Sequence, residues 1–191
     1  MGEVHIVGYH TCSLDNGLAH IQTHAPFHCN RERKQWLTHG YYFWTDSIHF
    51  AHEWGHQGYA GRYAIVKCSL NLDSTLLLDL VGNVEHQLYF GKLLKDYQAR
   101  FAELKRTGRV PQNAEPTVSR IISHWRKKVR TDRRVFPYVA IKAQDGYSRV
   151  NIPFVDSGRE CMPIPTRQQL CLFEEGYECI QNKELVHPST V

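Results

Sequence analysis

The chain has 191 residues, with 23 lysines and arginines against 19 acidic residues and a formal net charge of +4 when the histidines are neutral. This length suits one globular domain spanning 1–191, large enough to bury a core. The six cysteines include no Cys-x-x-Cys pair, which argues against a zinc ribbon and a disulfide framework. Because no apolar run is long enough to span a membrane and no signal peptide is recognisable, we expect a cytoplasmic protein without a membrane partner.

The first half of the chain predicts strands interrupted by short helices. Residues 4–11 alternate and are rich in β-branched and aromatic side chains, which predicts a strand, and a helix follows over about 14–23. An aromatic strand in "WLTHGYYFWT" leads to a helix over 47–56, which Thr45 or Asp46 can cap. "YAIVKCSLNL" and "TLLLDL" predict two further strands, and the second is apolar enough to be central in a sheet.

The second half of the chain begins with a helical insert at 83–134. A helix is predicted from 83 to about 106, with an apolar stripe formed by Leu88, Leu93, Leu94, Tyr97, Phe101 and Leu104. A second helix is predicted over about 117–129, after which "VFPYVAIKA", "YSRVNIPF", "QQLCLF" and "YECIQ" predict strands separated by turns. Strands at both ends with segregated helices favour an α+β fold class.

The insert carries a basic segment, "HWRKKVRTDRR" at 124–134, with seven basic residues when histidine is counted and one acidic residue. One interpretation is a solvated helix face. The other is a phosphate-binding surface in which Trp125 adds stacking on a base. The sequence does not distinguish the two interpretations, and the candidate substrate-binding residues here are Arg126, Lys127, Lys128 and Arg130.

The stretch "SIHFAHEWGHQG" has the spacing of a zinc-protease helix. His52 and His56 are four residues apart, so on a helix they can share a zinc ion while Glu53 serves as general base. Gly55 weakens such a helix, and the metzincin continuation is absent. Glu85 stays possible as a third ligand, so a zinc-dependent hydrolase is one hypothesis.

Three stretches, "GYHT", "HGYYFWTDSIHFAHEW" and "RQQLCLF", together resemble the ADP-ribosyltransferase superfamily. The likeness is to the branch with a His-Tyr-Glu triad, which includes the poly(ADP-ribose) polymerases. "QWLTHGYYFWT" is also similar to the Trp-Leu-Gly-His-Gly-x-Tyr-Phe-Trp-Glu signature of small bacterial proteins of this type, from which Thr38 and Thr45 depart. The insert at 83–134 is unmatched.

This resemblance implies an ADP-ribosyltransferase-like split antiparallel β-sandwich, in which two small sheets clamp NAD in a cleft. The reaction would cleave the bond between nicotinamide and ribose, with no metal. His10 would bond the adenosine ribose, and Thr11 would help hold the carboxamide through backbone groups. Tyr42 and Trp54 would sandwich the nicotinamide ring by stacking and cation–π attraction, and Ser47 matches a further position of the cofactor-binding motif.

The third position of the triad departs from the family. Gln169 stands before the apolar run "LCLF", where the family has a catalytic glutamate. A carboxylate stabilises an oxocarbenium-like transition state better than a neutral amide, although glutamine can still align the ribose. The resemblance therefore implies transfer of single ADP-ribose units. Glu160, Glu174 and Glu175 are other candidates for the carboxylate, and Gln168 would serve if the register shifts by one.

Arg167 occupies the position at which many family members recognise the acceptor, two residues before Gln169. If it faces the basic segment it suits a phosphate-bearing acceptor, and the alternative is a surface ion pair. We therefore expect an NAD-dependent mono-ADP-ribosyltransferase, a bacterial or phage-related toxin or effector of a toxin–antitoxin or phage-defence system. Its acceptor would be nucleic acid, RNA favoured, or protein, and a cognate antitoxin would be its partner. The rival hypotheses are the zinc hydrolase and a non-catalytic nucleic-acid-binding or nucleotide-binding module.

Overall fold

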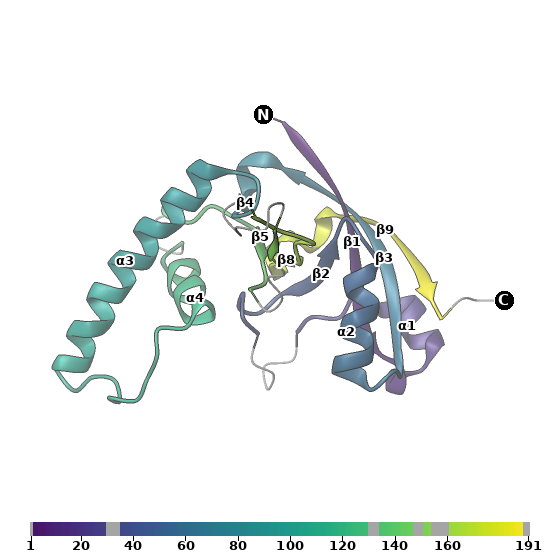
Figure 1. Cartoon of the computed structure of the whole chain (residues 1–191), viewed down its shortest axis with the longest axis horizontal. Coiled ribbons are helices and arrows are strands. Elements are labelled where there is room, and N and C mark those ends of the chain that lie inside the picture. The colour runs from purple at the N-terminus through teal and green to yellow at the C-terminus, as the bar shows by residue number, and fades with distance from the viewer. Residues whose placement is uncertain (1, 30–34, 130–133, 147–150, 154–160, 189–191) are drawn as a thin grey trace.

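The computed structural model describes residues 2–29, 35–129, 134–146, 151–153 and 161–188 (Figure 1). The main strands are β1 (Glu3–Ser13), β2 (Tyr41–Thr45), β3 (Tyr63–Asp73), β4 (Leu77–Asp79), β5 (Ala140–Gln144), β8 (Gln168–Leu172) and β9 (Ile180–His187). The helices are α1 (Leu18–His24), α2 (His49–Tyr59), α3 (Val84–Arg106) and α4 (Val118–Lys128), with short 3₁₀ helices at Leu14–Asn16, Ser74–Leu76 and Glu174–Cys179. Strands β6 (Asn151–Pro153) and β7 (Cys161–Pro163) pair separately.

The fold is α+β, as the sequence predicts, with one open seven-stranded sheet. The strand order is β4-β5-β8-β2-β1-β3-β9, in which β4 and β5 are parallel and the other neighbours are antiparallel. Figure 1 shows α2 lying against β1 and β3, whereas α3 and α4 extend from the end of the sheet that carries β4. Among the described residues, no helix is both long and apolar enough to cross a membrane.

The shortest strand pairing in the seven-stranded sheet is that between β1 and β2. These strands share two residue pairs, Gly8 with Thr45 and Tyr9 with Trp44, whereas β1 pairs with β3 along its whole length. Beyond Tyr9 the two strands part, although β1 stays paired with β3. The strand pairing therefore does not divide these strands into the two separate sheets of the expected split sandwich. They form one continuous sheet, which opens where β1 and β2 part.

Helices α1 and α2 begin later than predicted, at Leu18 and His49, and neither has a side-chain cap, so Thr45 and Asp46 do not cap α2. Helices α3 and α4 begin where the sequence predicts, because each has a side-chain cap. Asn83 precedes α3 and its amide oxygen accepts from the backbone N–H of His86 (3.2 Å). Thr117 precedes α4 and its hydroxyl accepts from the N–H of Arg120 (3.4 Å). Such caps satisfy backbone donors that the first turn leaves free, so they fix the starting residue locally.

Two details of the predicted core are wrong, and one interpretation of the basic segment loses its stacking residue, each because of tertiary packing. Strand β4 is an edge strand, not a central one, and Leu78 is buried because it packs into the apolar cluster that α3 and α4 complete. Leu88 is 65% exposed and so lies outside the apolar stripe of α3. Trp125 is buried and its indole N–H donates to the carbonyl of Leu93 (3.2 Å), which leaves it unable to stack on a nucleic-acid base.

Gly55 lets α2 pack closely against β3. A Cβ atom at this position would lie 2.3 Å from the ring of Tyr63, so no side chain fits without movement of the helix. The glycine that weakens the helix in isolation is therefore required by its contact with the sheet.

We expect Gly55→Ala to destabilise the protein by about 1–3 kcal/mol, the usual cost of overpacking, although alanine is the better helix former. Gly91→Ala is the matched control, because a Cβ on that α3 residue meets nothing within 4 Å. It should stabilise the protein by up to about 1 kcal/mol. Urea unfolding of the three proteins measures both changes, and equal effects in the two variants would contradict the packing of α2.

Candidate functional site

A cleft of about 400 Å³ opens where β1 and β2 part. Its walls come from β1, β2, β8, α2 and the residue after β5, together with loop residues before β2. The cleft brings together residues far apart in the sequence: His10, Thr11, Tyr42, Trp54 and Gln169 all line it. Ser47, which the sequence also suggested, is not among its lining residues, and its hydroxyl accepts instead from the N–H of His49 (3.2 Å).

The His10 side chain connects three segments, β1, β2 and the loop at Phe27, at the point where β1 and β2 part. Its Nδ1–H donates to the carbonyl of Tyr42 (3.0 Å), and its Nε2 accepts from the backbone N–H of Phe27 (3.1 Å). Burial lowers the pKa of this imidazole to about 4, so the ring is neutral at pH 7. Because both ring nitrogens are engaged, a ribose hydroxyl that binds Nε2 has to displace the Phe27 amide.

Thr11 also makes an internal bond, since its hydroxyl donates to the carbonyl of Ala51 (3.0 Å) in α2. This bond joins the end of β1 to the helix that carries Trp54. The side chain of Thr11 is therefore engaged with α2, and the role of its backbone groups in the cleft stays a prediction.

The two predicted stacking residues differ in how they are held. The hydroxyl of Tyr42 donates to the carbonyl of Thr38 (2.6 Å) and accepts from the N–H of Leu37 (3.0 Å), which fixes the ring. Burial raises the pKa of Tyr42 far above its ordinary value, so it stays a neutral phenol. Trp54 is exposed, and its indole lies so close to Gly58 that a Cβ there would be 3.0 Å from the ring.

Gln169 is oriented by a residue that the sequence did not indicate. The indole N–H of Trp36 donates to the amide oxygen of Gln169 (2.7 Å), which identifies the oxygen and leaves the NH₂ as the other polar end of this side chain. Trp36 also lines the cleft. The stretch "QWLTHG" gives only a weak sequence signal for this role of Trp36, because the two bonded residues are 133 positions apart in the chain.

Among the described residues, the other candidates for the role of Gln169 do not line the cleft. Gln168 neighbours Gln169 in β8, so its side chain points to the other face of the sheet, where it donates to Thr166 (3.0 Å). Glu174 and Glu175 follow the opposite end of β8, and Glu175 pairs with Arg126 (2.7 Å). Glu160 lies outside the described residues.

Asp145 supplies a carboxylate to the cleft, and the sequence did not indicate it. It directly follows β5, in which Ala143 is paired with Gln169. Alternate residues of a strand share a face, so Asp145 projects on the same side of the sheet as Gln169. Its backbone N–H donates to the carbonyl of Arg167 (2.8 Å), which continues the pairing by one step.

Arg167 is enclosed between two carboxylates. Its side chain is 4% exposed and lies 3.0 Å from Glu53 and 3.4 Å from Asp145. The guanidinium also lies 5.0 Å from the centre of the Trp44 ring. The sequence suggested that Arg167 faces the basic segment and binds an acceptor phosphate. The structure gives it a buried environment next to α2, where a phosphate would have to compete with both acids.

The basic segment is partly occupied by internal contacts. Arg126 bonds Glu175, donates to the carbonyl of His39 (3.4 Å) and lies 4.0 Å from the centre of the Phe173 ring. Lys128 lies over Trp125, and Lys127 is exposed. Arg130 lies outside the described residues.

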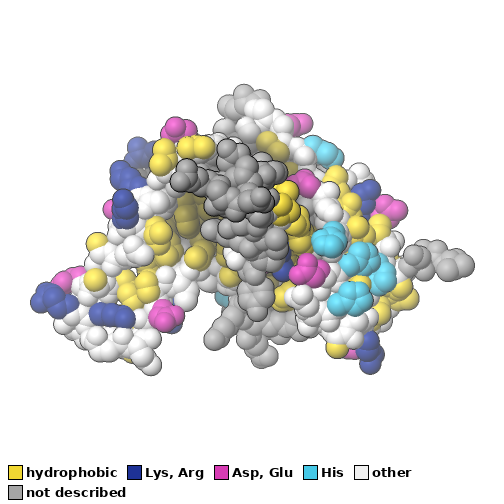
Figure 2. Space-filling view, in the orientation of Figure 1, with side chains coloured by type: hydrophobic (Ala, Val, Ile, Leu, Met, Phe, Trp, Pro, Cys, Tyr) yellow, Lys and Arg dark blue, Asp and Glu magenta, His cyan; other side chains and the backbone are white. Residues whose placement is uncertain are grey.

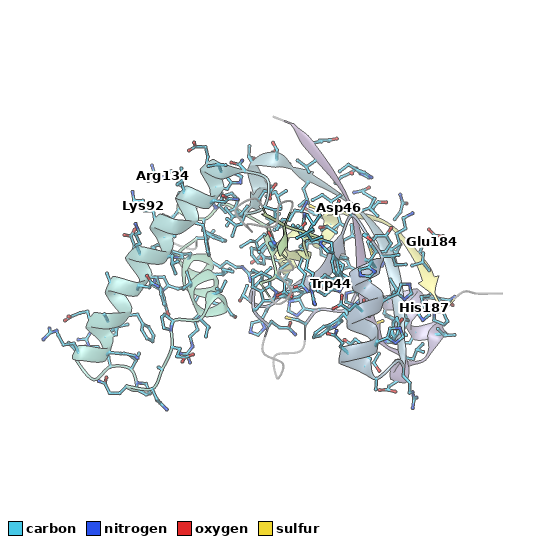
Figure 3. The ribbon with its side chains drawn as sticks, viewed as in Figure 1. Trp44, Asp46, Lys92, Arg134, Glu184 and His187 are labelled. Carbon is cyan, nitrogen blue, oxygen red and sulfur yellow. The ribbon has the colours of Figure 1, made fainter. Side chains whose placement is uncertain are left out.

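The residues of the zinc hypothesis point in two directions. The Tyr63 hydroxyl lies 2.8 Å from Nδ1 of His52 and 3.2 Å from Nε2 of His56, at hydrogen-bonding distance from both, whereas Glu53 bonds Arg167. Figure 2 shows histidines gathered over α2, and Figure 3 places Trp44 and His187 on opposite sides of this helix. In the part of the chain that the structure describes, no three His, Cys, Asp or Glu residues are grouped to hold a metal ion.

Comparisons with protein-family models, with curated proteins and with solved structures found no match. The residues that line the cleft include the aromatic rings of Tyr42 and Trp54, an oriented amide and a carboxylate, a set suited to a flat cationic ring attached to a sugar.

The neutral, buried His10 makes stability depend on pH. Its pKa is about 4 in the folded protein and near 6.5 in the unfolded chain, so the unfolded chain takes up the proton first as the pH falls. The contribution is complete above about pH 6.5 and is lost progressively towards pH 4. We expect wild type to lose roughly 2–3 kcal/mol more than His10→Gln between pH 7 and 4.5, measured by urea unfolding. Parallel pH profiles would contradict a neutral His10.

Proposed function

We propose that the chain is an NAD-dependent mono-ADP-ribosyltransferase that binds NAD in the cleft between β1 and β2. The observation that carries this proposal is the convergence of His10, Thr11, Tyr42, Trp54 and Gln169 on one cleft. The residues come from β1, β2, α2 and β8, and the motif resemblance selects them without reference to their positions in space. The zinc hypothesis has no comparable convergence, since Glu53 and its two histidines face different partners.

The backbone at Thr38 gives independent support. This residue has a φ of 77°, a left-handed conformation that glycine adopts freely and a β-branched residue rarely does. The signature that "QWLTHGYYFWT" resembles has glycine at this position. The left-handed backbone at Thr38 is thus one that the glycine of the signature adopts freely, and the Thr38 carbonyl accepts the hydroxyl bond that fixes Tyr42.

In the proposed mechanism, Tyr42 and Trp54 bind the cationic nicotinamide ring, an attraction of about 0.5–2 kcal/mol for each good cation–π contact. The bond from the ribose carbon to nitrogen breaks, both electrons leave with nicotinamide, and positive charge develops on the ribose. The carboxylate of Asp145 stabilises this charge, while the Gln169 amide, held by Trp36, aligns the ribose hydroxyls. The acceptor then attacks the same carbon and loses its proton.

The direct test is incubation with NAD labelled in its adenylate half, together with cell lysate, with and without a metal chelator. We expect label in nucleic acid or protein regardless of the chelator, with free nicotinamide as the second product. Labelled RNA would identify the favoured acceptor class. Absence of nicotinamide release would contradict the proposal, and binding of RNA without release would favour the non-catalytic module. Growth arrest on expression, relieved by a cognate antitoxin, is the expected behaviour of a toxin.

Trp54 and His56 lie on the same helix and separate the two enzymatic hypotheses. Because Trp54 is exposed and lines the cleft, we expect Trp54→Ala to raise the KM for NAD about tenfold or more without unfolding the protein. His56→Ala should leave most of the activity. Steady-state nicotinamide release measures both variants. The reverse pattern would favour the zinc-dependent hydrolase over the transferase.

Asp145 should act on the chemical step. We expect Asp145→Asn to lower kcat by about 100-fold with a smaller change in KM, because charge stabilisation is needed only in the transition state. Asp46→Asn is the matched control, since Asp46 is exposed, pairs with Lys142 and does not line the cleft. Equal kcat in Asp145→Asn and wild type would remove Asp145 from the mechanism.

A further inference from the structure

A second, wider groove lies beside the cleft. It has a volume of about 1150 Å³ and runs between the α3–α4 hairpin and residues 35–39. Gln35 and Trp36 line both the groove and the cleft, so the two spaces meet at these residues. The indole of Trp36 bonds Gln169, which places the junction beside the proposed reaction site. A molecule bound in the groove would reach the NAD cleft at Trp36.

The hairpin that forms one wall of the groove is strongly basic. The insert at 83–134 holds thirteen of the 23 lysines and arginines but five of the 19 acidic residues. The rest of the chain therefore has an acidic balance, although the whole is positive. Figure 2 shows lysine and arginine side chains along this hairpin. This distribution favours an anionic occupant.

Two cations are held at the loop between α3 and α4, which lines the groove. Lys105 donates to the carbonyl of Gln112 (2.8 Å), and Arg120 donates to the carbonyl of Glu115 (3.2 Å). Arg120 itself lines the groove, and Glu115 is the acidic residue among the lining residues. Carbonyl contacts leave these side chains charged, so they can still attract phosphate oxygens.

The groove also offers flat aromatic surfaces. Tyr97 and Phe101 of α3 stack with their ring centres 5.8 Å apart, and both line the groove opposite Trp36 and His39. Aromatic surfaces flanked by positive charge are the usual means of binding single-stranded nucleic acid without a defined sequence. An acidic peptide would use the charge but has less need of the stacked rings.

We propose that this groove binds a single-stranded nucleic acid and delivers it to the NAD cleft past Trp36. Its role as the acceptor site rests on the proposed function, whereas binding itself does not. The proposal moves the acceptor contacts away from Arg167 and from the C-terminal end of α4. They come to lie on α3, on the N-terminal turn of α4 and on the loop between these helices.

The test is fluorescence anisotropy with the full chain and labelled single-stranded RNA and DNA of the same sequence and about 12 nucleotides, within the usual site sizes. NAD is left out, so a failure of the proposed enzymatic function does not affect the result. The double variant Lys105→Gln/Arg120→Gln removes the charge of Arg120, which lines the groove, and that of Lys105, which bonds the loop between α3 and α4. Lys92→Gln/Lys95→Gln is the matched control, because these exposed residues lie on the opposite side of α3, where Figure 3 labels Lys92.

We expect the groove variant to bind at least about tenfold more weakly and its salt slope to fall by about 1.4, from two lost phosphate contacts. The control should change much less. Tyr97→Leu should weaken binding with an unchanged salt slope, as expected for lost stacking. Equal losses in the two double variants, or no binding of either oligonucleotide, would overturn the proposal. Binding of an acidic peptide in preference to both oligonucleotides would also overturn it.

Discussion

The imidazole of His10 holds together the part of the sheet where backbone pairing stops. Past Tyr9, strand β1 no longer pairs with β2, and the His10 ring spans the opening by bonding the Tyr42 carbonyl and the Phe27 amide. The cleft exists because the strands part here, and it keeps its shape because one neutral ring replaces the missing ladder bonds. A charged ring could not accept from Phe27, so the low pKa and the geometry depend on each other.

Helix α2 separates two chemical environments. On one side, Glu53 pairs with Arg167 and Trp54 lines the cleft. On the other side lies the phenol of Tyr63, which His52 and His56 contact and on which the ring of His187 stacks. Neighbouring positions of a helix are turned by about 100°, so a motif that is continuous in sequence is divided in space. The His-Glu-x-x-His spacing typical of zinc proteases is thus explained here by the packing of α2 on the sheet, in which the histidines and the glutamate have different partners.

The sequence predicts the local features well and the long-range ones poorly. Helix starts follow from caps at Asn83 and Thr117, and β1 follows from its alternation, because these signals act over a few residues. The environments of Trp125 and Arg167 depend on partners brought in by the fold, so their exposure could not be read from the chain. Asp145 enters the cleft only through the register of β5 with β8, which one sequence does not reveal.

The most direct measurement is a crystal structure of the protein with a non-hydrolysable NAD analogue. Our account predicts the nicotinamide ring between Tyr42 and Trp54, with its ribose beside Gln169 and Asp145 and the Phe27 amide displaced from His10 if the adenosine ribose binds Nε2. An analogue bound elsewhere, or a cleft that stays empty at saturating analogue, would contradict the central claim that the gap between β1 and β2 is an NAD site.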